Sequence, residues 1–153
     1  MWLRPCEKTI VHAIDTNILA RFYVDDPNDP EAQSQRPLAR QVLAESSSVF
    51  VPLSVILELE WVLRAFYSFD SHDFARVIDH LLGLPHITVE HWERVVDALE
   101  WYRQGLDFAD ALHLAASDHC EKLISFDDKR FARRAQRLNL KPSVIVPKDL
   151  EGA

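Results

Sequence analysis

The stretch that decides the fold is IVHAIDTN, residues 10–17. Residues 10–14 form a short, largely apolar and β-branched run, which predicts a buried β-strand. Asp15 follows at once, and Thr16 and Asn17 open an amphipathic helical pattern. In open parallel sheets, functional groups gather at the carboxyl ends of the strands, and Asp15 occupies such a position.

Apolar runs of this kind alternate with helical patterns along the rest of the chain. We expect strands at residues 10–14, 49–51, 87–89, 122–125 and 144–146, and helices at residues 16–26, 31–45, 55–67, 71–82, 90–103, 107–119 and 128–138. Ser71 is the predicted N-cap of its helix, and Gly105 the glycine that follows a helix end. The alternation predicts an α/β sandwich with a mainly parallel sheet.

The composition indicates one globular domain. The chain has 153 residues, of which 48% are hydrophobic and only three are glycine. A net charge of −7 argues against a protein that coats nucleic acid by bulk electrostatics. It does not exclude a nuclease, because acids that bind a metal ion present positive charge once they are loaded.

The compartment is predicted from the cysteines and the first residues. Cys6 and Cys120 form neither a disulfide framework nor a CxxC motif, which favours a reducing environment. Residues 1–9 are of mixed polarity, and the apolar run after them is too short for a signal peptide or a membrane span. We therefore expect a soluble, cytoplasmic protein.

Carboxylates lie at the edges of apolar elements throughout the chain. They are Asp15, Glu58, Asp107, Asp110, Asp127 and Asp128. Two carboxylates about 4 Å apart repel by roughly 4 kcal/mol at an effective dielectric of about 20, whereas a domain is stable by only about 5–15 kcal/mol. Converging acids must therefore share protons, bind a cation, or not converge at all.

Each of these acids also has a purely structural interpretation. Asp15, and either Asp127 or its neighbour Asp128, can simply cap the helix that follows. Asp107 stands where an N-cap belongs, with Asp110 inside the first turn, where it would interact favourably with the helix dipole. Asp110 is the safer site candidate, because it leads a segment too apolar for a solvated helix.

Glu58 and Glu60 compete for one role, because side chains two residues apart on a helix point about 200° apart. Glu60 has Arg64 at i+4, a conventional surface pair. Glu58 lies between Val55 and Val62 on a face that should be buried, where an acid needs a partner. We therefore expect Glu58 to be the ligand and Glu60 to lie on the surface.

The residue types of this set favour a hard cation. His113 could join Asp110 at i+3, but a histidine in an apolar helix is more often a hydrogen-bonded core residue, and the histidines show no zinc-binding spacing. Asp and Glu oxygens select Mg²⁺ or Mn²⁺, which bind substrate phosphates in their open positions. This is the chemistry of phosphodiester hydrolysis.

Basic residues follow the last acids. Lys129, Arg133 and Arg137 recur every four residues, with Arg130 and Arg134 beside them, on the helix expected after Asp128. Such a helix is either a solvated face or a basic rim for a polynucleotide backbone. A charged helix is more often a solvated face, and its position next to the acids adds weight to the second interpretation.

Four sequence motifs in this order resemble the PIN-domain family, and within it the VapC-like toxins of toxin–antitoxin pairs. They are IDTNIL (14–19), ELEWVLRAFY (58–67), DFADALHLA (107–115) and SFDDKRF (125–131). The resemblance runs from residue 10 to residue 146. It implies a three-layer α/β/α sandwich around a parallel sheet and a Mg²⁺- or Mn²⁺-dependent endoribonuclease.

The resemblance also implies roles for single residues. The family's four acids match Asp15, Glu58, Asp110 and Asp127. Asp107 would be an accessory acid and Asp128 an alternative fourth ligand, while Thr16, Asn17 and Ser125 would orient ligands and water by hydrogen bonds. Lys129, Arg130, Arg133 and Arg134 are the candidates for contact with the RNA backbone.

The remaining expectations concern organisation and partners. A nuclease domain at residues 10–147 would follow an N-terminal extension, residues 1–9, and precede a short tail, residues 148–153. By the same resemblance the protein would be a homodimer blocked by a small antitoxin. The rivals are a haloacid-dehalogenase-like phosphatase, which would need a second Asp where Asn17 stands, and a non-enzymatic module that binds a partner.

Overall fold

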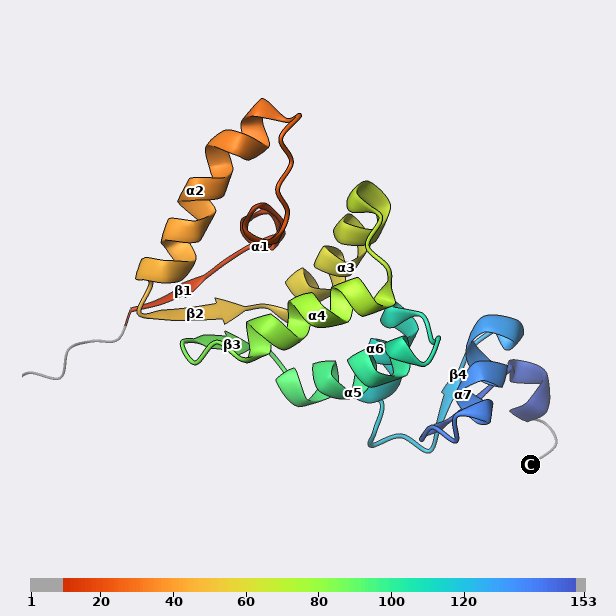
Figure 1. Cartoon of the computed structure of the whole chain (residues 1–153). Helices are drawn as coiled ribbons and strands as arrows, with labels where there is room; N and C mark the ends of the chain where they lie inside the picture. Colours follow the sequence, from red (N-terminus) through yellow and green to blue (C-terminus); the bar gives the residue numbers. More distant parts are fainter. Residues whose placement is uncertain (1–9, 151–153) are drawn as a thin grey trace, which may run out of the picture. The chain divides into compact units, whose positions relative to one another are not determined.

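The computed structural model describes residues 10–150 (Figure 1). The chain divides after Glu90 into two compact units. Each unit combines helices with parallel strands. The predicted α/β class with a mainly parallel arrangement of strands is therefore confirmed. Among the described residues, no helix has the length and apolar character needed to cross a lipid bilayer.

The first unit contains a three-stranded parallel sheet in the order β1-β2-β3. Its strands are β1 (Val11–Ala13), β2 (Ser48–Val51) and β3 (Ile87–Val89), and its helices are α1 (Thr16–Tyr23), α2 (Pro30–Glu45), α3 (Leu53–Tyr67) and α4 (Ser71–Leu82). Helix α1 packs against α2 and α3, and α4 packs against β3. The core of this unit includes Leu19, Val49, Ile56, Leu59, Leu63, Phe74, Ile78 and Leu81, all fully buried.

The prediction of a buried first strand is wrong. All three residues of β1 are exposed, and only Ile14, directly after the strand, is buried. The reason lies in the packing, because among the described elements β1 makes extensive contact only with β2, whereas helix α4 packs against the other edge strand, β3. The buried positions belong to the central strand, where Val49 and Val51 are inaccessible to solvent.

The second unit pairs two helices and two short parallel strands. Its elements are α5 (Trp92–Arg103), α6 (Phe108–Ala116), β4 (Lys122–Ile124), a π-helical turn η1 (Asp128–Ala132), α7 (Arg133–Arg137), β5 (Ser143–Ile145) and a 3₁₀ turn η2 (Pro147–Leu150). Helix α5 packs against α6, strand β4 pairs with β5, and both η1 and α7 pack against β5. Leu99, Leu106, Phe108 and Leu114 are fully buried.

Local capping explains where the helices begin and end. Gly105 has φ +104°, which confirms the glycine predicted after α5. The N-cap predicted at Ser71 is wrong, because Asp70 occupies that place and forms a capping box with Asp73. Helix α6 ends at Ala116, whereas the prediction extended it to residue 119. Just after this end, the Ser117 hydroxyl donates to the His113 carbonyl and so competes with the backbone N–H that would continue the helix.

The predicted helix at residues 128–138 is divided in two. Ala132 N–H donates to the Asp127 carbonyl and Arg133 N–H to the Asp128 carbonyl, both in the i→i+5 pattern of a π-helix. Only residues 133–137 are α-helical. The wider turn rotates the side chains before it relative to those after it. The basic residues between 129 and 137 therefore do not form one continuous stripe along a helix.

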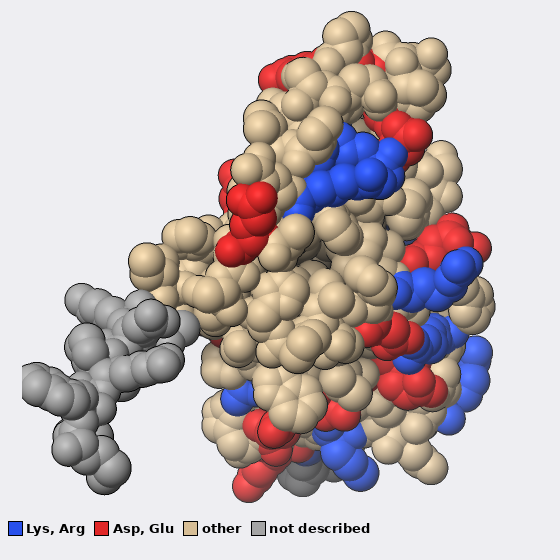
Figure 2. Space-filling view, turned by 60° about the vertical axis from the view of Figure 1, so that its left-hand side comes forward, with Lys and Arg blue, Asp and Glu red and all other residues tan. Residues whose placement is uncertain are grey.

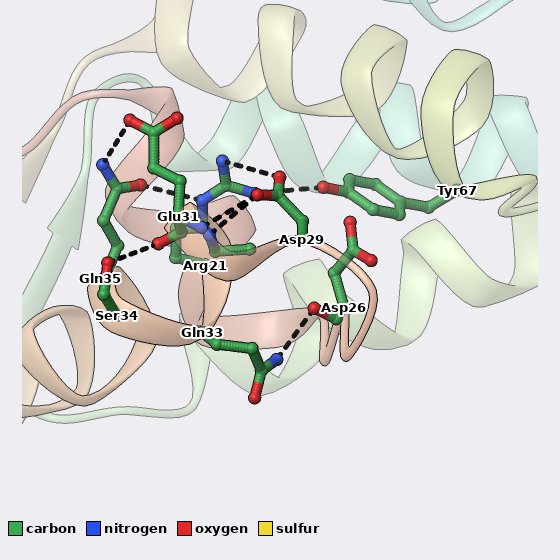
Figure 3. Close-up of polar contacts among 9 residues, drawn as sticks. Arg21, Asp26, Asp29, Glu31, Gln33, Ser34, Gln35 and Tyr67 are labelled. Carbon is green, nitrogen blue, oxygen red and sulfur yellow. Dashed lines mark hydrogen bonds and ion pairs between the residues drawn. The ribbon is translucent and has the colours of Figure 1, made fainter.

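Arg21 ties three helices of the first unit together (Figure 3). Its Nε donates to Oε1 of Gln35 on α2 at 2.9 Å, and its Nη1 donates to the Tyr67 hydroxyl on α3 at 3.2 Å. Its Nη2 lies 3.9 Å from Oδ2 of Asp29, whose other carboxylate oxygen caps α2. The Arg21 side chain is only 18% exposed, so these contacts are shielded from water.

We expect Arg21→Met to lower the free energy of unfolding by about 2–3 kcal/mol, because the variant leaves part-buried acceptors without their charged donor. Arg21→Lys should also destabilise, since one ammonium cannot replace a guanidinium fork. Tyr67→Phe should cost about 1 kcal/mol. Urea unfolding followed by circular dichroism measures these differences, with exposed Arg40→Met as the control. A wild-type midpoint for Arg21→Lys would contradict this role.

Candidate active site

Asp15 lies at the carboxyl end of β1, as the sequence predicts. Ile14 N–H donates to the Phe50 carbonyl at 3.2 Å, so that the pairing with β2 continues to the residue before Asp15. Oδ1 of Asp15 accepts the N–H of Ile18 at 3.3 Å and caps α1. The capping role is therefore real, but it occupies one carboxylate oxygen of an exposed side chain. Thr16 beside it is buried, and Asn17 is exposed.

The burial predicted for the two glutamates of α3 is reversed. Glu58 is exposed, whereas Glu60 is only 6% exposed, and its Oε1 accepts from Nε of Arg64 at 2.8 Å. The expected Glu60–Arg64 pair is confirmed, but Glu60 is not a surface residue. Glu60 lies on the same side of the helix as Ile56, which is four residues earlier and buried. Glu58 points about 200° away from Ile56.

Asp107 and Asp110 hold the start of α6. Oδ2 of Asp107 accepts the N–H of Asp110 at 3.2 Å, which confirms Asp107 as the N-cap. Asp110 is half-buried in the first turn, on a helix whose Ala111 and Leu114 are fully buried. Asp110 is therefore partly shielded from the water that would stabilise its charge.

Asp127 occupies the same kind of position before η1. Its Oδ1 accepts the N–H of Arg130 at 2.9 Å, and its own N–H donates to the Ser125 hydroxyl at 3.0 Å. Asp128 differs, since its Oδ2 lies 2.8 Å from Nη2 of Arg133. The two neighbouring acids are thus distinguished, because Asp128 already has a cationic partner.

Three acids of the second unit interact electrostatically. Burial raises the pKa of Asp110 above its ordinary value, the charges of Asp107 and Asp127 raise that pKa further, and His113 lowers it. Within residues 10–150, however, no group of three or more His, Cys, Asp or Glu side chains is arranged so that it could hold a metal ion. The described contacts thus bring Asp110 under the influence of two like charges without forming a complete ligand set.

The basic residues after the acids have different environments. Arg133 is paired with Asp128, and Nη1 of Arg134 donates to the Gly105 carbonyl at 2.8 Å. Lys129 and Arg130 are exposed, and they form no ion pair within the described part of the chain. On the face in Figure 2, charges of both signs are interspersed around a largely uncharged centre, and the described residues there form no broad basic surface.

One feature is absent from the sequence prediction. Gln104, Gly105, Arg134, Arg137 and Leu138 line a pocket of about 320 Å³ in the second unit. Residues 104 and 105 are separated from residues 134–138 along the chain, so spacing alone gives no sign that they meet. The only hint in the sequence is that Arg134 and Arg137 are three residues apart in a helical segment.

A raised pKa means that ionised Asp110 destabilises the folded state at neutral pH. In EDTA at pH 7, we therefore expect Asp110→Asn to raise the urea midpoint, against the usual direction for a substitution. The gain should disappear as the pH falls below about 4, where the carboxyl is protonated in both states. Exposed Asp118→Asn is the control, and a lower midpoint for Asp110→Asn at pH 7 would contradict the repulsion.

Comparison with known proteins agrees with the resemblance seen in the four motifs. The family model described as the PIN domain matches residues 13–137, which include all six candidate acids. No curated protein matches the sequence. The PIN domain is generally a nuclease fold whose members use divalent metal ions and bind RNA. With a match over more than half of its residues, the chain belongs to the PIN-domain family.

Proposed function

We propose that this protein is a Mg²⁺- or Mn²⁺-dependent endoribonuclease that hydrolyses RNA phosphodiester bonds. The observation that carries the proposal is the PIN-domain match over residues 13–137, which spans all four proposed ligands. Half-buried Asp110 supports it, because its pKa is raised by burial and by the charges of Asp107 and Asp127. Folding maintains this unfavourable arrangement, and a divalent cation would offset the repulsion. Membership of the PIN-domain family supports a nuclease over a haloacid-dehalogenase-like phosphatase.

Four acids would hold the ion or ions, namely Asp15, Glu58, Asp110 and Asp127. Asp15 and Asp127 each use one carboxylate oxygen as a helix cap, so the second oxygen can bind a cation. Glu58 is exposed and can reach a ligand, whereas Glu60 is held by Arg64. Asp127 is preferred to Asp128 as the fourth ligand, because Asp128 is engaged by Arg133.

The chain's own groups have two further tasks. Capping hydrogen bonds fix the orientation of Asp15, Asp107 and Asp127, and the Ser125 hydroxyl fixes the backbone at Asp127. Thr16 and Asn17 would orient ligands and water beside Asp15. When bound, the divalent ion would supply Lewis-acid stabilisation of phosphate charge and lower the pKa of a water molecule. Hydrolysis then requires no nucleophilic side chain.

The biological setting is proposed on the resemblance to VapC-like toxins. The protein would be the toxin of a toxin–antitoxin pair, act in the cytoplasm, form a homodimer and be blocked by a small antitoxin protein. Cys120 is a free, exposed thiol, which fits a reducing compartment. The exposed aromatic pair Trp61 and Phe66 on α3, with ring centroids 5.4 Å apart, provides apolar surface for one of these partners.

The activity is tested on single-stranded RNA. Purified protein free of any partner should cut RNA internally when Mg²⁺ or Mn²⁺ is added, and EDTA should stop the reaction. Asp15→Asn should reduce the rate at least about 100-fold, because it removes a charged ligand while keeping a good N-cap residue for α1. Denaturing gels and circular dichroism measure cleavage and fold.

Asp118→Asn is the matched control, since it removes an exposed carboxylate of the second unit without touching the proposed ligands. Its cleavage rate should equal that of the wild type. Cleavage that survives both EDTA and Asp15→Asn would exclude the metal mechanism. A folded wild type that never cuts RNA would instead favour the non-enzymatic, partner-binding module.

Metal binding can be measured without any substrate. Because the ion binds only the folded site, Mn²⁺ should raise the melting temperature, with about 2.7 kcal/mol of stabilisation at a concentration 100 times Kd. Asp110→Asn should blunt that rise, and Asp118→Asn should not. A wild-type melting curve that stays unchanged up to millimolar Mn²⁺ would contradict the ligand assignment.

A further inference from the structure

The pocket on α7 has the composition of an anion site. Of its five lining residues, Gln104, Gly105, Arg134, Arg137 and Leu138, two are arginines and none is acidic. Its volume of about 320 Å³ is well above the roughly 10–15 Å³ that one water molecule requires. A Cβ placed on Gly105 would meet no atom within 4 Å, so open space lies over this backbone. The pocket therefore admits a ligand group larger than water.

The two arginines are held differently. Arg134 and Arg137 are three residues apart on α7 and therefore lie on the same side of the helix. Arg134 is oriented by its 2.8 Å hydrogen bond to the Gly105 carbonyl. Arg137 forms no hydrogen bond or ion pair with any residue that the structure describes. Its guanidinium is thus available to a ligand.

The acids nearest in sequence to the lining residues have other partners. Glu100 accepts hydrogen bonds from Arg103 at 3.4 Å and from Gln104 at 2.9 Å. Asp128 is paired with Arg133, and Asp107 is turned toward the first turn of α6. None of these carboxylates forms an ion pair with Arg134 or Arg137 in the described part of the chain, so both guanidinium groups can bind an anionic ligand.

We propose that this pocket binds a phosphodiester group of the RNA strand, next to the nucleotide that is cut. The inference rests on the proposed ribonuclease function and adds a binding subsite outside the metal ligands. Guanidinium groups bind phosphate oxygens through paired N–H donors, which suits an arginine pair better than a lysine pair. Gly105 is two residues from Asp107, so their Cα atoms are at most about 7.6 Å apart. A strand held in the pocket therefore runs close to the acids.

The test measures binding of a fluorescent single-stranded RNA by anisotropy in EDTA, where no cleavage occurs. At 0.1 M salt, Arg137→Gln should weaken binding about fivefold, and the slope of log K against log salt should become shallower by about 0.7, as for one lost phosphate contact on a single strand. Arg137→Lys should keep the wild-type slope. Circular dichroism checks that each variant is folded.

Arg40→Gln is the control, since it removes the same charge from an exposed arginine of α2 that belongs to no proposed binding site. It should bind RNA within twofold of the wild type. Equal losses for Arg40→Gln and Arg137→Gln, or none for Arg137→Gln, would overturn the subsite. Inorganic phosphate is tested separately. If phosphate raises the wild-type melting temperature but Arg137→Gln does not change RNA affinity, the pocket binds a free anion and the RNA assignment is wrong.

Cleavage separates this inference from the proposed function. With Mn²⁺, Arg137→Gln should raise KM about fivefold and leave kcat unchanged, because the contact is the same in the ground state and the transition state. RNA binding that depends on Arg137 in a protein that never cleaves would support the subsite and refute the nuclease. Normal cleavage with an unchanged KM for Arg137→Gln would refute the subsite and leave the nuclease intact.

Discussion

The structure depends on a constraint at the start of every helix, where the first N–H groups have no partner within the helix. At several of its helical turns this chain meets the constraint with an aspartate, and three of these are the candidate ligands or accessory acids Asp15, Asp107 and Asp127, each of which accepts one N–H from the following turn. A carboxylate has two oxygens, and capping uses one of them. The same residue can therefore stabilise its helix and still present its second oxygen to the proposed cation, so the capping and ligand interpretations are compatible.

Asp110 lacks this support, which makes it the informative acid. It lies inside the first turn of α6 rather than before it, and it contributes its backbone N–H, not its carboxylate, to the cap. Burial and the charges of Asp107 and Asp127 act against its ionised form. The helix dipole favours an anion at this position but only by about 0.3–1 kcal/mol, so the proposed divalent ion would be the stronger means of compensation.

The features that sequence predicts well are those determined by neighbouring residues. Strand β3 and the glycine after α5 agree with the prediction, because an apolar run and a glycine at a helix end determine the backbone locally. The exposure of β1 and the burial of Glu60 differ from the prediction, because each depends on which other element covers that side of the strand or helix. Arg21 illustrates the difference, since its partner Tyr67 is 46 residues away and no local pattern pairs them.

The π-helical turn has the widest consequence for charge. In a continuous α-helix, Lys129, Arg133 and Arg137 would share one side at a spacing of four. The i→i+5 hydrogen bonds of η1 instead bring Arg133 to Asp128, and this ion pair removes one member of the expected stripe. Helix α7 restarts the α-helical spacing at Arg133, and Arg134 and Arg137 line one pocket with Gly105. Because of this wide turn, the basic residues are divided into the Asp128–Arg133 ion pair and a separate pocket lined by Arg134 and Arg137.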